Sequence, residues 1–379
     1  MHQQDTSRLN IVHCFRSPVG GIFRHVRDLV DQQHRQGHRV GILCDSLDGG
    51  EYEDQMFEAL MPKLSLGLKR IPMRRSISPM DIPALLKAHK EIKPMTPDVI
   101  HSHSAKGGVF GRSTGFMLSR GKKKTVTLYC PHGGAMHYDS ASLKGKVFFF
   151  AERFLERFTD RLILVSKYER DAYHEKVGNP QCEEALIYNG LSSFEFEPVL
   201  PSKDAADFLY IGMMRDLKGP DVFLDAMRIL NSSAEKKFTA HFVGDGPDKE
   251  TYVQTIKKYG LENQITVHDA MPARNAFAMA KLVVVPSRAE SMPYLVLEAL
   301  AAAKPIIATN VGGIPEIFEG SDHQLIEPGN ADELATGMLT AIENPDSQKI
   351  ASRFSHELQN RFTVEVMSKH VEQAYRDCL

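Results

Sequence analysis

Two cations stand three residues apart in the second half of the chain, where they could bind a diphosphate. Arg215 and Lys218 follow a short apolar run and open a helical pattern. A diphosphate at the amino end of a helix would meet both side chains and the unsatisfied backbone N–H groups. Each charge-assisted hydrogen bond contributes about 1.5–3 kcal/mol. The chain has no Asp-x-Asp pair to hold a metal, so the cations would replace a divalent ion; the alternative is two ordinary surface charges.

Two carboxylates frame the strongest local pattern. Glu290 and Glu298 are separated by seven residues, and Pro293 between them suits the first turn of a helix. This spacing predicts that Glu290 lies in a loop at the carboxyl edge of a sheet and Glu298 one to two turns along the helix, up to about 12 Å away. Such a pair suits a ligand with hydroxyl groups at both ends. The alternative is two exposed helix residues.

Glycine-rich turns follow several apolar runs. Gly20 and Gly21 come after the first run, and Gly244 and Gly246 follow a run in the second half. Glycine leaves room for a phosphate or a sugar at these points, although a plain turn explains the pattern almost as well. The second turn lacks the third glycine and the acidic residue of a dinucleotide fingerprint, which disfavours hydride transfer.

Three histidines lie at the ends of apolar runs in the first half. His132 precedes Gly133, so its imidazole is expected at a sheet edge, where it can donate a hydrogen bond to a hydroxyl group or to developing charge. An isolated histidine would equally fit a structural role. His101 and His103 share one face of a strand, which suggests a metal site, but no third ligand stands at a recognisable spacing. We therefore expect no metal.

Short β-branched runs alternate with longer amphipathic stretches along the whole chain. This alternation is typical of parallel strands joined by helices and predicts an α/β fold. The expected strands are residues 9–14, 38–44, 98–101, 124–130, 161–165 and 185–188, followed by 208–212, 239–244, 264–268, 282–286, 305–309 and 323–326. The candidate residues follow these strands, at the edge where ligands of open α/β sheets bind.

The alternation of expected strands and helices is interrupted once, at residues 190–206. This segment contains two prolines and three serines and has little periodicity, so we interpret it as a linker. It separates residues 1–189 from residues 207–360, and each part is expected to form a Rossmann-like, doubly wound parallel sheet, with the two domains facing a central cleft. Residues 361–379 are helical in pattern, and their packing partner stays open.

Composition narrows the classes of function. The 379 residues are 42% hydrophobic and carry a formal net charge of −2, so no overall field favours nucleic acid. The N-terminus shows no signal pattern, and no apolar stretch is long enough to span a bilayer. The five cysteines lie far apart without a C-x-x-C pair, as in proteins of a reducing compartment. We expect a cytoplasmic protein that binds no nucleic acid.

One stretch mixes cations with aromatic residues. Residues 144–158 hold four cations and five phenylalanines, and a helix of this kind can lie on an anionic membrane. The basic segment 63–75 could likewise meet an anionic acceptor or be a solvated loop. The alternative for the first stretch is that its apolar side chains face the core of their own domain: Phe148, Phe149, Leu155 and Phe158.

Taken in order, these motifs resemble those of the retaining GT-B glycosyltransferases of family 4, the group 1 type. The resemblance covers nearly the whole chain, and six motifs in the right order are hard to obtain by chance. The motifs are Gly20-Gly21, His132-Gly133, Arg215-x-x-Lys218-Gly219, Gly244-Asp245-Gly246-Pro247, Glu290-x7-Glu298 and Gly312-Gly313-Ile314-Pro315-Glu316. The family's chemistry is a metal-independent transfer of a sugar, with retention, from a nucleoside diphosphate sugar.

The resemblance implies roles for five side chains. Arg215 and Lys218 would hold the diphosphate, and Glu298 would hold the ribose. Glu290 would bind the transferred sugar, and His132 would lie over it. The catalytic set would thus be His132, Arg215, Lys218 and Glu290.

The remaining implied contacts line the substrates. Gly20 and Gly21 would lie near the phosphates and the acceptor, which the first domain would bind. The nucleotide and sugar would be lined by Gly244, Gly246, Ala270, Met271, Ser291, Met292, Pro293 and Tyr294. No cofactor is implied beyond the sugar nucleotide, with UDP or GDP as its expected carrier.

The implied acceptor is a glycan or a lipid-linked molecule, in bacterial cell-surface polysaccharide or lipopolysaccharide synthesis. Residues 144–158 would then make peripheral contact at the inner face of the cytoplasmic membrane. Three other classes are open but ranked below transfer. They are a sugar-nucleotide epimerase of similar fold, a non-catalytic sugar-nucleotide-binding protein and a phosphorylase that uses pyridoxal phosphate.

Overall fold

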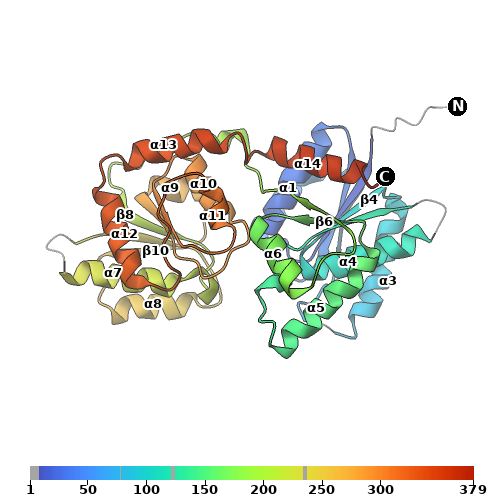
Figure 1. The fold of residues 1–379 in the computed structure, drawn as a ribbon, viewed down its shortest axis with the longest axis horizontal. Coiled ribbons are helices and arrows are strands. Elements are labelled where there is room, and N and C mark those ends of the chain that lie inside the picture. Colours follow the sequence, from blue (N-terminus) through green and yellow to red (C-terminus); the bar gives the residue numbers. More distant parts are fainter. Residues whose placement is uncertain (1–7, 77, 121–123, 234–236) are drawn as a thin grey trace. The chain divides into compact units, whose positions relative to one another are not determined.

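The described chain divides into two α/β units. The computed structural model describes residues 8–76, 78–120, 124–233 and 237–379. The N-terminal unit contains the described residues up to Gly190 together with Val364–Leu379, and the C-terminal unit contains Leu191–Thr363 (Figure 1). The last helix, whose packing partner the sequence left open, therefore belongs with the N-terminal unit. Each unit has a parallel sheet with helices on both faces, so the predicted α/β class is confirmed.

The sheet of the N-terminal unit has seven parallel strands in the order β3-β2-β1-β4-β5-β6-β7. Strand order reverses between β1 and β4, and this is the point at which open α/β sheets bind ligands beyond the carboxyl ends of their strands. The strands are β1 (Asn10–Phe15), β2 (Arg39–Asp45), β3 (Gly67–Ile71), β4 (Val99–His103), β5 (Val126–Cys130), β6 (Arg161–Leu164) and β7 (Glu183–Leu186).

The helices of this unit cover both faces of the sheet. The core beneath α1 and α2 includes Phe15 and Phe23, and the core beneath α3 and α4 includes Val12 and Phe110. Helix α14 packs on α1. The helices are α1 (Gly20–Arg35), α2 (Glu51–Leu60), α3 (Asp81–Ile92), α4 (Ser104–Ser119), α5 (Leu143–Leu155), α6 (Lys167–Lys176) and α14 (Val364–Arg376), with 3-10 helices η1 (Met61–Lys63), η2 (Lys93–Met95), η3 (Gly134–His137) and η4 (Glu156–Phe158).

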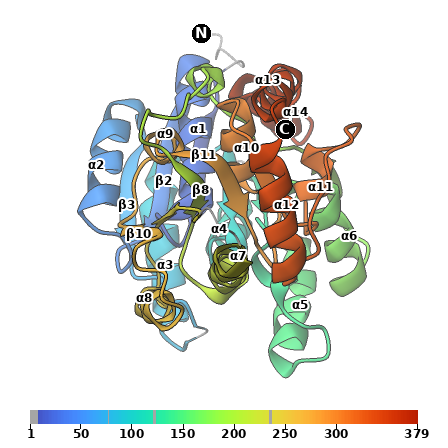
Figure 2. The same ribbon diagram turned by 90° about the vertical axis from the view of Figure 1, so that its left-hand side faces the viewer.

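The C-terminal unit has five parallel strands in the order β10-β9-β8-β11-β12. Its main core lies between the sheet and the helices α7, α8 and α12, which Figure 2 shows together. The strands are β8 (Ala206–Ile211), β9 (Ala240–Val243), β10 (Ile265–His268), β11 (Ala280–Val285) and β12 (Ile306–Ala308). The helices are α7 (Pro220–Ser233), α8 (Lys249–Lys258), α9 (Ala273–Ala278), α10 (Tyr294–Ala301), α11 (Ile314–Ile317), α12 (Ala331–Glu343) and α13 (Ser347–Leu358), with 3-10 helices η5 (Ser193–Phe196) and η6 (Asp216–Lys218).

Glycines let the loops after neighbouring strands of this sheet pack directly on one another. A Cβ atom at Gly244 would lie 2.0 Å from the carbonyl oxygen of Gly212, and one at Gly246 would lie 2.4 Å from that of Met214. Gly312, with φ +59°, would place a Cβ atom 1.7 Å from the carbonyl oxygen of Glu290. Close approach of the protein's own backbone therefore accounts for these glycines, where the sequence suggested room for a ligand.

Two strand predictions were wrong. Strand β3 lies inside the basic segment 63–75, and its cations are paired within the unit: Lys69 Nζ lies 3.1 Å from a carboxylate oxygen of Glu91, and Arg70 contacts Asp54. A short edge strand that carries cations shows no apolar run, so periodicity missed it. Residues 323–326 form no strand; Ile326 makes only an isolated bridge with Thr309.

The helices give no sign of crossing a membrane. Within the described ranges, none combines the length and apolar content that a bilayer span requires. The predicted linker, residues 190–206, contains η5, and from Leu191 onward it belongs to the C-terminal unit.

We predict that Gly312→Ala destabilises the protein more than Gly329→Ala does. Both glycines have positive φ, so each alanine costs about 1 kcal/mol of backbone strain. Only Gly312 also faces backbone within contact distance, while a Cβ atom at Gly329 meets nothing within 4 Å. Overpacking should cost a further 1–3 kcal/mol or so. Equal free energies of unfolding for the two variants, measured by chemical denaturation, would contradict the close packing of the Gly312 loop.

Candidate functional site

An ion pair joins two of the predicted motifs in the C-terminal unit. Lys218 Nζ lies 2.6 Å from Glu290 Oε1, and Ser287 Oγ donates to the same oxygen at 2.8 Å. Glu290 is only 8% exposed, and removal of the lysine would leave a nearly buried carboxylate without a cation beside it. The two residues are 72 positions apart in sequence. They meet because β8 and β11 are neighbours in the sheet and both loops follow carboxyl ends.

Arg215 differs from Lys218 in having no partner. Its side chain is half-buried, and no described residue accepts a hydrogen bond from its guanidinium group or pairs with its charge. The predicted placement of the two cations at a helix start needs a correction. Arg215 immediately precedes the 3-10 helix η6, Lys218 is the last residue of η6, and α7 begins only at Pro220. Both cations therefore stand in the loop that precedes α7.

Arg288 braces this loop and was missed from the sequence. Its backbone N–H donates to the carbonyl oxygen of Leu217 at 2.9 Å, and its guanidinium group donates to the carbonyl oxygen of Asp216 at 2.8 Å. It also forms two bonds to the carboxylate of Asp221. Burial favours the neutral form of Asp221, but the bonds and charge of Arg288 outweigh it and lower the pKa. An arginine in the loop after β11 was the feature of the sequence that could have indicated this role.

The segment from Ser291 to Glu298 comprises the end of the loop after β11 and the first part of α10. Glu298 lies in the second turn of α10, as the spacing predicted, and is half-buried. Met292 and Tyr294 are buried. Ser291 Oγ is buried and has no hydrogen-bond partner in the described part of the chain. Pro293 immediately precedes α10.

The other predicted site residues of the C-terminal unit lie in loops that follow β9 and β10. Ala270 and Met271 lie in the loop after β10, and Ala270 is exposed. Gly244 and Gly246 lie in the loop after β9, against the backbone of the β8 loop. The predicted site residues of the C-terminal unit therefore lie in loops at one edge of its sheet, or, for Tyr294 and Glu298, in the helix that follows such a loop.

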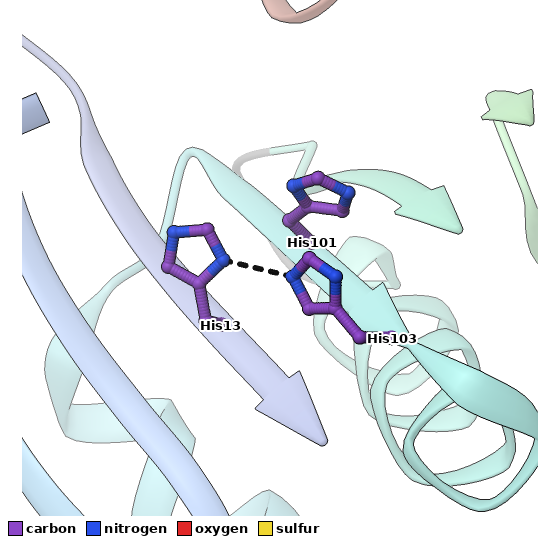
Figure 3. Close-up of side chains that lie close together, drawn as sticks. All are labelled: His13, His101 and His103. Atoms are coloured by element: carbon purple, nitrogen blue, oxygen red, sulfur yellow. Dashed lines mark hydrogen bonds between the residues drawn. The ribbon is translucent and has the colours of Figure 1, made fainter. Parts of the chain in front are cut away.

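In the N-terminal unit, five histidines form a cluster: His13, His25, His101, His103 and His132. Strands β1 and β4 pair in register with His13 opposite His101, which places His13 beside both histidines of β4 (Figure 3). His13 Nδ1 lies 3.0 Å from His103 Nε2, and His103 Nδ1 lies 3.0 Å from His132 Nε2.

Residues from two helices complete the hydrogen bonds of the cluster. His13 Nε2 lies 2.9 Å from Gln33 Oε1 of α1, and Gln33 Nε2 lies 3.2 Å from the hydroxyl of Tyr375 in α14. That hydroxyl lies 2.8 Å from His101 Nδ1. His25 Nδ1 contacts Asn189 Oδ1 at 3.1 Å. The cluster thus draws on segments from β1 to the last helix.

Burial keeps these imidazoles neutral. It lowers the pKa of His13 to about 4 and that of His25 to about 3, despite hydrogen bonds that favour the charged form. The pKa values of His101, His103 and His132 are also well below the ordinary value, because of burial and of the neighbouring histidines. At neutral pH each ring therefore carries one proton.

A third histidine lies beside His101 and His103, although the sequence shows no third ligand at a recognisable spacing. One nitrogen each of His13, His101 and His103 lie within 4.8 Å of one another. The signal was available, because two strands in register bring position 13 beside position 101. The nitrogens of His13 are, however, both hydrogen-bonded already. The two triads found among the described residues contain histidines only, with no carboxylate to balance an ion.

His132 occupies a constrained turn. Its φ is +52°, in the left-handed region that a non-glycine residue seldom adopts. The backbone N–H of the following Gly133 donates to the buried carboxylate of Glu169, which also accepts from Val165 N–H. Glu169, missed from the sequence, therefore holds the turn that aims the His132 ring, which is itself half-buried.

The glycine pair of the N-terminal unit is open, unlike those of the other unit. Gly20 and Gly21 are exposed, and a Cβ atom at Gly20 would meet nothing within 4 Å. They begin α1, whose N-cap residue Val19 offers no side-chain hydrogen bond. The first N–H groups of the helix are thus free of a side-chain cap and suit an anion.

Helix α5 divides its aromatic residues between core and surface. Phe149 and Leu155 are buried, in agreement with the expectation that they face the core. On the other side, four apolar side chains at helical spacing are 45–80% exposed: Leu143, Val147, Phe150 and Phe154. The sequence argument did not separate these two faces.

Two family models cover most of the chain. Residues 19–193 match the glycosyltransferase family 4 model, and residues 192–358 match the model of glycosyl transferases group 1. An uncharacterised glycosyltransferase of Methanocaldococcus jannaschii is 26% identical over 95% of both chains. The UDP-Gal:alpha-D-GlcNAc-diphosphoundecaprenol alpha-1,3-galactosyltransferase of Escherichia coli is 22% identical over 78% of this chain and 80% of its own.

The fold agrees with these matches. The structure of Anabaena HepE in complex with UDP and glucose aligns with a TM-score of 0.77 and 20% identity, covering 97% of this chain and 99% of the other. The likeness extends to both parallel-sheet units, so the fold is GT-B. This chain belongs to the group 1 glycosyltransferases with the GT-B fold.

Proposed function

We propose that the protein transfers a sugar from a nucleoside diphosphate sugar to a glycan or lipid-linked acceptor, with retention and without a metal. The observation that carries this proposal is the Lys218–Glu290 pair beside the unpaired Arg215. Two cations and one buried carboxylate stand in loops at one sheet edge. They match a ligand that is anionic at its diphosphate and hydroxylated at its sugar.

The cations supply what a divalent ion would otherwise supply. Arg215 has all its guanidinium N–H groups available to a phosphate, and Lys218 uses one of its three donors on Glu290. Arg288 and Asp221 hold the loop in place before the ligand arrives. Charge that develops on the departing diphosphate is thus stabilised by groups that need no rearrangement.

The reaction follows from these groups. Glu290 accepts hydrogen bonds from the hydroxyl groups of the sugar, and Glu298 accepts those of the ribose. The bond between the anomeric carbon and the diphosphate oxygen breaks, and the acceptor oxygen bonds to the same face of that carbon. The acceptor's proton passes to the departing phosphate oxygen. In the N-terminal unit, His132 is the residue that we propose to hydrogen-bond the transferred sugar.

The relatives support a donor class and an acceptor class. Anabaena HepE was solved with UDP and glucose, and the Escherichia coli relative is named for a UDP-linked galactose and a diphosphoundecaprenol-linked acceptor. A UDP-linked sugar is therefore the donor to test first, with GDP-linked sugars next. A lipid-linked sugar is the acceptor class to test, in the synthesis of cell-surface polysaccharide or lipopolysaccharide, at the cytoplasmic side of the membrane.

Helix α5 offers a surface for such an acceptor's membrane. Its exposed apolar stripe is Leu143, Val147, Phe150 and Phe154. Lys144, Lys146 and Arg157 are exposed on the same helix and its continuation, so the patch joins apolar and cationic groups. Helices of this composition bind anionic lipid surfaces. We propose peripheral contact through residues 144–158.

The overall proposal predicts turnover in EDTA and a product of retained configuration. The wild-type protein is incubated with UDP- and GDP-sugars and a lipid-linked sugar acceptor, and the anomeric configuration is read by NMR. Activity that requires added magnesium would contradict the cationic replacement of a metal. An inverted product would contradict same-face attack, and isomerised donor without acceptor would indicate an epimerase.

Lys218→Ala should abolish stabilisation by the sugar nucleotide. The variant loses a diphosphate contact and leaves the buried Glu290 carboxylate without its cation. We expect the thermal shift that the donor causes in EDTA to disappear. Lys281→Ala is the matched control, because Lys281 Nζ contacts the buried carboxylate of Asp207 at 2.9 Å in the same unit, outside the proposed site. An equal loss of the shift in both variants would argue against a specific role for Lys218.

Substituting the exposed phenylalanines of α5 should weaken membrane binding. The double variant Phe150→Ser, Phe154→Ser removes two large apolar groups, and we expect at least about tenfold weaker sedimentation with phosphatidylglycerol vesicles. Ile82→Ser with Leu86→Ser is the control, since both are exposed on α3. Unchanged binding of the α5 variant, or the same loss in the α3 variant, would exclude α5 as the membrane contact.

A further inference from the structure

A continuous hydrogen-bonded path leads from His101 in β4, through Tyr375 of the last helix, to the turn that carries His132. We call it the polar path. It visits, in order, His101, Tyr375, Gln33, His13, His103 and His132, with contacts of 2.8–3.2 Å. All members are buried except His132, which is half-buried.

Each ring of the polar path must donate on one side and accept on the other. A neutral imidazole has one N–H group and one bare nitrogen. Two neighbouring rings can therefore bond only when one offers its N–H and the other its bare nitrogen. The direction chosen at one end of the path is transmitted to the other end, and it decides which nitrogen of His132 carries the proton.

The end of the path at His101 fixes the direction. His101 Nε2 is buried and has no hydrogen-bond partner in the described chain. A buried N–H group without an acceptor is rarer and costlier than a bare acceptor atom. His101 therefore carries its proton on Nδ1 and donates it to the hydroxyl oxygen of Tyr375.

Tyr375 must then donate its own proton to Gln33. The hydroxyl group is fully buried, and its contacts in the described chain are with His101 and Gln33. In the structure the amide nitrogen of Gln33 faces Tyr375, which leaves one buried donor without an acceptor. A rotation of the amide by 180° exchanges oxygen and nitrogen, keeps both contacts and gives the hydroxyl proton of Tyr375 an acceptor.

We propose that the polar path runs in this direction along its whole length and holds the proton of His132 on Nδ1. Gln33 then donates to His13, His13 to His103, and His103 to His132 Nε2. At the end of the path this leaves the Nδ1–H of His132, which no described residue accepts. His132 is thereby presented as a hydrogen-bond donor, which is the state that a sugar hydroxyl or developing negative charge requires.

Tyr375 and Gln33 are thus positioning residues for His132. The inference rests on the proposed function only where it assigns a sugar to His132; the proton position itself is a property of the protein alone. A metal ion between His13, His101 and His103 would have to replace the His13–His103 bond and would interrupt the path.

The proton position can be measured on the full chain without substrate. In protein labelled with ¹⁵N-histidine, the His132 signals are identified by their loss in His132→Gln. We expect Nδ1 to show the shift of a protonated nitrogen and Nε2 that of a bare one. A proton on Nε2, or on both nitrogens, at neutral pH would overturn the proposal. Absence of sugar transfer would contradict only the proposed function.

Tyr375→Phe tests the path through its far end. Without the hydroxyl group the direction is no longer fixed, so His132 should show both tautomers. We expect kcat to fall about tenfold, as when a group that fixes a histidine's tautomer is removed, with little change in KM for the sugar nucleotide. Tyr173→Phe is the matched control, a buried tyrosine of the same unit that bonds Glu156 at 2.8 Å. An unchanged His132 signal in Tyr375→Phe, or an equal change in Tyr173→Phe, would overturn the proposal.

Discussion

A carboxylate that is removed from water needs a cation beside it, and the loops of the C-terminal unit are arranged around that requirement. Glu290 is nearly buried and is held by Lys218 and Ser287. The pairing is possible only because the loops after β8, β11 and β12 lie in direct contact, which Gly219 and Gly312 allow. The glycines, the hydrogen bonds of Arg288 and the Lys218–Glu290 ion pair therefore all hold the same loops together. Arg215, which has no side-chain partner among the described residues, stays available to meet an anion.

The N-terminal unit solves a related problem without charge. Five imidazoles are clustered, four of them buried and His132 half-buried, and this environment keeps them neutral. Each neutral ring offers one hydrogen-bond donor and one acceptor, so neighbouring rings can bond only when their protonated nitrogens are arranged compatibly. We propose that Gln33 and Tyr375 fix which nitrogen of each ring carries the proton, up to His132. The half-buried ring of His132 is the member of the cluster at which this arrangement of protons reaches the surface, and there we propose that it meets a ligand.

Sequence reasoning succeeded where the signal was local. Apolar runs followed by glycine or charged loops located eleven of the twelve strands and placed Glu290 and Glu298 correctly relative to α10. It missed the edge strand β3, because the cations of this strand interrupt its apolar pattern. It also predicted a strand at residues 323–326, where Ile326 makes only an isolated β-bridge. No local pattern could have joined Tyr375 to His101, which are 274 positions apart. The histidine companions of His101 became visible only through strand register.

The last helix of the chain belongs to the first unit, and this has a consequence for biosynthesis. Residues up to Gly190 leave the ribosome long before Tyr375 is made, yet the buried hydroxyl that closes the polar path comes from Tyr375. During translation the N-terminal sheet must therefore wait with an uncovered polar seam above β1 and β4 while the entire second unit is synthesised. Completion of the histidine cluster therefore awaits α14, and a nascent chain that stops short of this helix lacks the hydroxyl group that bonds His101 and Gln33.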